Sequence, residues 1–244
     1  MMKRLVAEAL GLSPDAMDKF FHDPPRNKVS LLKYPPPSSP QQNQGNNKSI
    51  HGIYDDEGDD AAGTFQGVGP HKDGGFLTYL LQATDHPGLE AQNKSGEWIP
   101  IPPMDDTLVV NVGRSLEAMT NGVCIATTHR VSLRPQDFVD QLGRPRGPRF
   151  SYPVFQTLKL DVMHDELCSL KIPDHIRALV KDKNIESDAE NFFAQYHLMS
   201  PGQGIFTARL TSHPDVGRRW YPELLDAALN GQRESAVVGQ GANA

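Results

Sequence analysis

The feature that most restricts the fold is a series of short, β-prone runs between residues 76 and 157, most of them followed by a turn signal. The turns carry glycine, proline or asparagine, as at residues 86–88 and 120–122. Short strands at such close spacing, with few long helical periods between them, favour an antiparallel sandwich or barrel. The sequence therefore predicts a mainly β core, with runs at residues 76–81, 89–91, 98–99, 107–112, 123–128 and 149–155.

Helical patterns flank this core on both sides. Residues 2–11 have apolar side chains at helical spacing and end at Gly11, and Ser13-Pro14 is typical of the start of a second short helix. A β-prone run at 29–34 stops before three prolines, so Tyr34 is expected at a strand end. Residues 173–183 and 187–196 have helical periodicity, whereas 204–210 fits either a strand or a helix.

Composition narrows the function classes. A chain of 244 residues with 38% hydrophobic content can form one sizeable core, and a net charge of −6 offers no basic stripe for nucleic acid. Its two cysteines, Cys124 and Cys168, are too few for a disulfide framework, and neither a signal peptide nor an apolar run of membrane-spanning length is present. We therefore expect a cytoplasmic protein with a small-molecule partner and no nucleic-acid or membrane partner.

A metal-binding pattern precedes the first of the strands. His71 and Asp73 lie two residues apart among glycines, and side chains at i and i+2 of an extended strand point the same way. His129, on a later β-prone run, would complete the two-imidazole, one-carboxylate set that suits non-haem Fe(II). Such a pair is weak alone, since about one is expected by chance in a chain with this composition. A second pair, His213 and Asp215, has a proline between its members and is predicted to be a turn.

Several motifs occur together in one order that resembles a known family. The chain is similar to Fe(II)- and 2-oxoglutarate-dependent oxygenases of the isopenicillin N synthase-like group, closely over residues 65 to 157, and residues 212–222 look like the C-terminal helix region of fungal members. The motifs that carry the resemblance are Gly67 to Thr78, Gly88-Leu89-Glu90, Gly96-Glu97-Trp98, Val109-Val110-Asn111-Val112-Gly113, Thr120-Asn121-Gly122, Thr128-His129-Arg130-Val131 and Arg149-Phe150-Ser151.

The resemblance implies a double-stranded β-helix, or jelly roll, with flanking helices and a defined set of site residues. His71, Asp73 and His129 would hold Fe(II), and the site would use 2-oxoglutarate and O2 with no catalytic residue beyond the metal ligands. Arg149 and Ser151 would bind the distal carboxylate of 2-oxoglutarate, because a guanidinium fork grips a carboxylate through two hydrogen bonds. Tyr34 matches a family tyrosine that often contacts 2-oxoglutarate, although Leu32 stands where an asparagine is usual.

The predicted domain organisation follows from the same comparison. Residues 64–157 would form the jelly-roll oxygenase core and 158–231 a C-terminal helical region, preceded by 1–34 with two helices and the first strand. Residues 35–63, rich in proline, polar and acidic residues, are predicted to be a disordered insertion, since so little apolar surface cannot offset the entropy of ordering. Residues 232–244 would form a flexible tail.

Three functions remain open. The first is a dioxygenase that hydroxylates or desaturates a small molecule, with 2-oxoglutarate converted to succinate and CO2; fungal relatives suggest secondary metabolism. The second is an Fe(II) oxidase that uses no 2-oxoglutarate. The third is a non-catalytic binding protein, because family members usually carry a further N-terminal part, whose absence would also expose apolar surface and favour self-association. Tyr79, Leu89 and Phe155 are expected near the substrate by position only.

Overall fold

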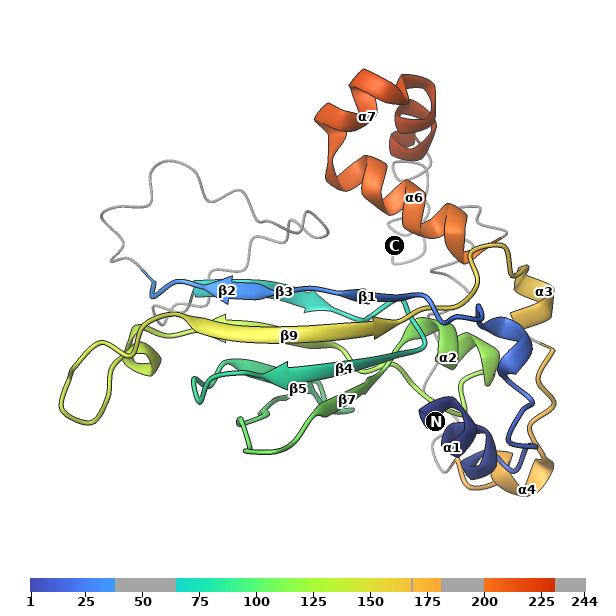
Figure 1. Cartoon of the computed structure of the whole chain (residues 1–244), viewed down its shortest axis with the longest axis horizontal. Helices are drawn as coiled ribbons and strands as arrows, with labels where there is room; N and C mark the ends of the chain where they lie inside the picture. Colours follow the sequence, from blue (N-terminus) through green and yellow to red (C-terminus); the bar gives the residue numbers. More distant parts are fainter. Residues whose placement is uncertain (38–64, 168, 181–199, 231–244) are drawn as a thin grey trace, which may run out of the picture. The chain divides into compact units, whose positions relative to one another are not determined.

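The computed structural model describes residues 1–37, 65–167, 169–180 and 200–230. It divides into two compact units, each assembled from segments that are distant in sequence (Figure 1). The described residues within 27–114 and 126–156 form a unit that we call the β unit, and those within 1–26, 115–125 and 157–230 form a second that we call the helical unit.

The β unit contains two antiparallel sheets, so the predicted mainly β core is confirmed. The first sheet has the order β1-β9-β4-β7, with β2 also paired to β9. The second has the order β3-β8-β5-β6. The first sheet is built from β1 (Asn27–Val29), β2 (Leu32–Tyr34), β4 (Leu77–Gln82), β7 (Val109–Val112) and β9 (Arg149–Gln156); the second from β3 (Phe65–His71), β5 (Leu89–Gln92), β6 (Trp98–Pro100) and β8 (His129–Leu133).

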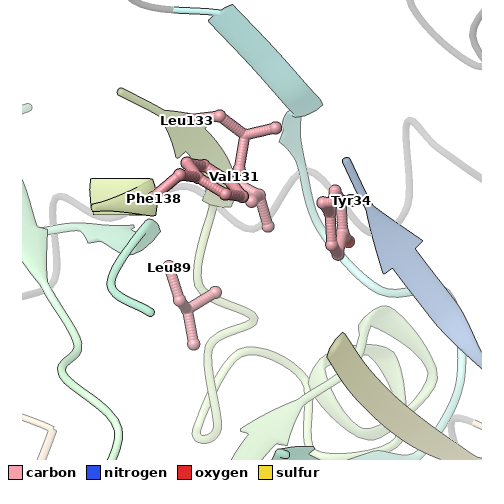
Figure 2. Packing of buried hydrophobic residues seen from close by; sticks show 5 residues of the cluster. All are labelled: Tyr34, Leu89, Val131, Leu133 and Phe138. Carbon is pink, nitrogen blue, oxygen red and sulfur yellow. The ribbon is translucent and has the colours of Figure 1, made fainter. Parts of the chain in front are cut away.

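A buried apolar cluster joins residues of both sheets (Figure 2). Tyr34 comes from the first sheet, and Leu89, Val131 and Leu133 come from the second. Phe138, from the short 3-10 helix η3 (Pro135–Phe138), completes the cluster. Burial of these side chains supplies the hydrophobic stabilisation that holds sheets face to face.

Strand alternation decides which side chains of β4 can reach the interior. Thr78 lies opposite Asn111 of β7 and Phe155 of β9, and Gln82 lies opposite Ser151. These residues share one face because directly opposed residues point the same way across a sheet. Tyr79 points to the other face, where its hydroxyl donates a 2.7 Å hydrogen bond to Gln156.

The helical unit begins with α1 (Met2–Ala9), and Gly11 just after it has φ +70°, as the predicted C-cap requires. The second helix predicted at Ser13-Pro14 is wrong: only a 3-10 turn, η1 (Asp18–Phe20), forms there. The backbone hydrogen bonds here join residues three apart, from the amides of Ala16, Asp18 and Phe20 to the carbonyls of Ser13, Asp15 and Met17, which is the pattern of turns and 3-10 helix. The other helices are α2 (Arg114–Met119), α3 (His164–Leu167), α4 (Asp174–Arg177), α6 (Pro201–Ser212) and α7 (Pro214–Trp220), of which Arg114 belongs to the β unit.

Three further sequence predictions need correction. Residues 123–128 are not a strand, because the Cys124 amide bonds to the Thr120 hydroxyl at 3.0 Å and continues the turn; β8 starts only at His129. The run at 29–34 is two strands, β1 and β2, rather than one. The segment His213-Pro214-Asp215 is not an isolated turn, since Pro214 occupies the first position of α7.

The ambiguous run at 204–210 is helical and belongs to α6. Several predictions lie outside the described residues: nearly all of the 35–63 insertion, the helix at 187–196, the tail and Cys168. Of the predicted helix at 173–183, α4 is the part that the structure describes as helical. Among the described helices, none has the length and apolar character needed to cross a membrane.

Candidate metal centre

His71 and His129 are brought side by side by strand pairing. His71 is the last residue of β3 and His129 the first of β8, and the two are directly opposed in the antiparallel register. Their ring centroids are 4.3 Å apart. Asp73 lies beyond the end of β3, so it reaches the same point from the turn after the strand and not from the strand itself. One donor atom from each of the three residues lies within 4.8 Å of the others.

Backbone carbonyls orient both imidazoles. His71 Nδ1 lies 2.8 Å from the carbonyl oxygen of Gly69, and His129 Nδ1 lies 3.0 Å from that of Thr127. A carbonyl oxygen only accepts, so Nδ1 is the donor in each contact, and Nε2 is the ring nitrogen turned toward Asp73. The two Nε2 atoms are 3.7 and 3.8 Å from Asp73 Oδ1. Both imidazoles therefore face the Asp73 carboxylate.

The Asp73 carboxylate is held by two side chains whose contribution was not predicted. Its Oδ2 accepts hydrogen bonds from the Thr78 hydroxyl at 2.6 Å and from the Asn111 amide at 2.7 Å, and the residue is only 7% exposed. Thr78 and Asn111 both lie within the family motifs, but their meeting depends on the β4–β7 register, which no local sequence signal reveals.

The backbone around Asp73 is equally tightly placed. The Arg114 amide donates to the Asp73 carbonyl oxygen at 2.7 Å. A Cβ at Gly113 would lie 2.0 Å from the Gly75 carbonyl oxygen and 3.1 Å from that of Asp73. Glycine is therefore required at 113 for the end of β7 to approach the turn that carries the carboxylate.

A buried guanidinium lies on the same side of the first sheet. Tyr34 is directly opposite Arg149, and Leu32 is opposite Ser151. Arg149, Ser151 and Tyr34 are 1%, 2% and 7% exposed, and the guanidinium carbon of Arg149 lies 5.0 Å from the centroid of the Tyr34 ring. Burial raises the pKa of the Tyr34 hydroxyl despite the neighbouring cation, and lowers the pKa of Arg149.

The hydrogen bonds of Arg149 are incomplete within the described chain. Its Nη2 donates to Gln82 Oε1 at 3.3 Å, while Nε and Nη1 are buried and find no acceptor among the described residues. Buried guanidinium N–H groups without partners are costly, so they fit an anion supplied from outside. Gln82 was not predicted as part of the site.

Side chains of one strand, β4, contact both Asp73 and Arg149. Thr78 touches Asp73 and Gln82 touches Arg149, and both lie on the same face of β4. Four residues of strand span roughly 13 Å between Cα atoms, a gap that the side chains and a small dicarboxylate can fill. A metal that the 2-oxo acid group can chelate at one end, and a cationic side chain for the second carboxylate at the other, would suit a 2-oxo dicarboxylic acid.

The three residues expected near the substrate have different positions. Phe155 lies opposite Thr78, on the face that carries the site. Leu89 is 5% exposed and belongs to the apolar cluster, and Tyr79 points to the opposite face of β4. Phe155 thus lies across from Thr78 and Leu89 packs in the cluster that contains Tyr34, whereas Tyr79 points away from the site residues of β4.

A second buried charge cluster lies next to His129. Glu90 is 5% exposed and accepts hydrogen bonds from Arg130 at 2.8 Å, Ser132 at 3.1 Å and Arg134 at 2.8 Å. Burial alone would raise the pKa of Glu90, but these three hydrogen bonds outweigh it and lower the pKa. Since Glu90 lies opposite Arg130 in the β5–β8 register, the cluster fixes the strand that begins with His129.

Comparison with known families agrees with this geometry. The sequence profile described as the 2OG-Fe(II) oxygenase superfamily matches residues 27–157, which is more than half of the chain. The chain belongs to this superfamily. The expected cofactors, Fe(II) and 2-oxoglutarate, are the two that the family description names.

Two fungal relatives of this chain are named as enzymes. It is 42% identical over 233 residues to a 2-oxoglutarate-dependent dioxygenase of Gibberella zeae, covering 95% of this chain and 56% of the relative. It is 39% identical over 228 residues to the 2-oxoglutarate-dependent dioxygenase frbJ of a Dothideomycetidae species, covering 91% of this chain and 54% of the relative. The chain thus spans about half the length of these curated relatives.

Solved structures support the fold. A full-length Neurospora crassa protein in complex with alpha-KG and thymine has a TM-score of 0.55 to this oxygenase at 22% identity, covering 85% of this chain and 51% of that one. JOX2 in complex with 2OG, Fe and JA has a TM-score of 0.51 at 20% identity, covering 78% and 51%. The predicted jelly-roll core with flanking helices is confirmed.

Proposed function

We propose that this oxygenase hydroxylates or desaturates a small organic substrate and couples that oxidation to the conversion of 2-oxoglutarate to succinate and CO2. The observation that carries the proposal is the convergence of His71, Asp73 and His129, each of which places one possible ligand atom within 4.8 Å of the others. Two imidazoles and one carboxylate on one side of a metal leave positions open for other ligands, which is the arrangement of non-haem Fe(II) oxygenases.

Each residue of the site has a separate task in this proposal. His71, Asp73 and His129 bind the metal, and Arg149 with Ser151 receives the distal carboxylate of 2-oxoglutarate. The unpartnered Nε and Nη1 of Arg149 support that assignment, since both are buried and both donate. Tyr34 packs against the guanidinium and fixes its plane.

Fe(II) with 2-oxoglutarate supplies the activation of O2, a chemistry that no protein side chain provides. The protein contributes position and exclusion of water. Burial of Asp73, Arg149 and Ser151 keeps the site dry, and in a medium of low dielectric constant the attraction between Arg149 and a carboxylate is stronger than in water.

Succinate release tests the proposal. The protein is incubated with Fe(II), ascorbate and 2-oxoglutarate, with and without a panel of small metabolites, and succinate is quantified. We expect iron-dependent succinate above background that falls to background in Asp73→Ala. Asp105→Ala, which removes an exposed carboxylate in a loop, serves as the matched control and should keep the wild-type rate.

Binding measurements decide among the outcomes. Under anaerobic conditions, metal-loaded protein should bind 2-oxoglutarate, and Arg149→Met should not. Metal binding without affinity for 2-oxoglutarate would instead favour an Fe(II) oxidase in which Arg149 holds a substrate carboxylate. A folded protein that binds no divalent metal would contradict the proposed enzyme and favour a non-catalytic binding protein.

A further inference from the structure

We propose that Thr78 and Asn111 are positioning residues that restrict Asp73 to one metal-binding oxygen. The inference rests on the function proposed above and concerns how the carboxylate is presented. A free carboxylate can bind a metal through one oxygen or through both. In a three-ligand site the difference matters, because a second bound oxygen takes a position that 2-oxoglutarate or O2 needs.

The two carboxylate oxygens of Asp73 have different surroundings. Oδ2 receives both short bonds, 2.6 Å from Thr78 and 2.7 Å from Asn111, whereas Oδ1 lies 3.7 and 3.8 Å from the two imidazole Nε2 atoms. Two donors, one of them with a near-rigid amide plane, leave Oδ2 aimed away from the histidines. Oδ1 is then the oxygen presented to the metal.

The arrangement is set by the first sheet. Thr78 on β4 and Asn111 on β7 are directly opposed, so their side chains stand next to each other on one face. Asp73 comes from the turn between β3 and β4, and the Arg114 amide bonds its carbonyl oxygen at 2.7 Å. Backbone and side chain of Asp73 are therefore both anchored to strands, and neither depends on the metal for its position.

Metal affinity of variants tests this inference without turnover. The probe is Mn(II), which accepts the same imidazole and carboxylate ligands and whose free concentration is read by electron paramagnetic resonance. Thr78→Val and Asn111→Leu keep side-chain size but remove the donors. We expect each to raise the Kd for Mn(II) about 10-fold, and the pair together about 100-fold, as losses of such supporting hydrogen bonds commonly do.

Two controls separate positioning from general stability. Thr78→Ser keeps the hydroxyl and should restore the Kd to within about twofold of wild type. Tyr79→Phe removes a hydrogen bond of 2.7 Å from the opposite face of the same strand and should leave the Kd unchanged. Unfolding temperatures measured on the apo variants show how much stability each change costs.

The outcomes distinguish this inference from the proposed function. Wild-type protein that fails to bind Mn(II) would overturn the metal centre itself. Wild-type protein that binds Mn(II), with Thr78→Val and Asn111→Leu binding equally well, would overturn the positioning of Asp73 and leave the metal centre intact. A Kd that rises in Thr78→Ser as much as in Thr78→Val would also overturn it.

Discussion

Glu90 and Arg149 are both buried charged residues of the β unit, but their surroundings differ. The Glu90 carboxylate accepts three hydrogen bonds from Arg130, Ser132 and Arg134, so protein groups neutralise it. The Arg149 guanidinium is more deeply buried, yet Nε and Nη1 have no acceptor in the described chain. Protein donors therefore satisfy the Glu90 carboxylate, whereas two N–H groups of Arg149 could still donate to an anion.

Glu90 and Arg149 differ in how fully the described chain satisfies their hydrogen-bonding groups. Burying a charge is costly, and a protein recovers that cost only through pairing and hydrogen bonds. The Glu90 cluster recovers it within the folded chain. Arg149 recovers only part of it through Gln82 and Tyr34, so under the proposed function a bound carboxylate would relieve the remaining desolvation cost.

The largest expected effect is at Arg149. Arg149→Met keeps an unbranched, flexible side chain and removes the unpaired charge, so we expect affinity for 2-oxoglutarate to fall about 100-fold or more. The same change should stabilise the unliganded protein by about 1–2 kcal/mol, since an unsatisfied buried group is gone. Calorimetric titration and urea unfolding measure the two effects.

The matched control for that variant is Arg144→Met, which removes an arginine with a 72% exposed side chain. It should change neither quantity measurably. An Arg149→Met protein that is less stable than wild type, and still binds 2-oxoglutarate, would break the comparison between the two clusters.

The next largest effect is expected at Glu90, where substitution should lower the stability of the unliganded protein, whereas Arg149→Met should raise it. Glu90→Gln leaves two arginines facing a neutral amide, so we expect a loss of stability of about 2 kcal/mol, reduced from a fully buried case because Arg130 and Arg134 are partly exposed. Urea unfolding should show it, and Glu97→Gln in the exposed β5–β6 hairpin should show almost none.

A smaller effect concerns pH. The pKa of Glu90 is lowered in the folded state, so its contribution to stability is fully present above its ordinary, unfolded pKa, near 4.5, and is lost as the pH falls through the folded value. We expect the stability difference between wild type and Glu90→Gln to be constant near neutrality and to shrink below about pH 4.5. A difference that grows on acidification would contradict the assignment.

The smallest effect is expected at an exposed pair. Asp85 is 90% exposed and contacts Arg146 at 2.9 Å, a distance close to those in the buried Glu90 cluster. Because water screens it, Asp85→Asn should change the unfolding free energy by no more than about 0.5 kcal/mol. A loss comparable to that of Glu90→Gln would mean that burial is not what separates these charges.

Much of the fold could be predicted locally. Strand runs such as those of β4 and β9 alternate or concentrate apolar residues between turn signals, and both form strands as this pattern predicts. The run at 123–128 could not be judged in this way, since its composition suits a strand while the hydrogen bond from Cys124 to Thr120 continues a turn. Likewise, the start signal at Ser13-Pro14 does not reveal that the backbone after it bonds from residue i to i−3 and forms turns and a 3-10 helix.

The sequence by itself determined the family, and it predicted the candidate site residues because His71, Asp73, His129, Arg149 and Ser151 occur in an ordered set of specific motifs. Tertiary structure alone decided what supports them. Thr78, Asn111 and Gln82 reach Asp73 and Arg149 through strand register, and the carbonyls of Gly69 and Thr127 orient the two imidazole rings. Register depends on the pairing of strands far apart in sequence, so no local pattern encodes it.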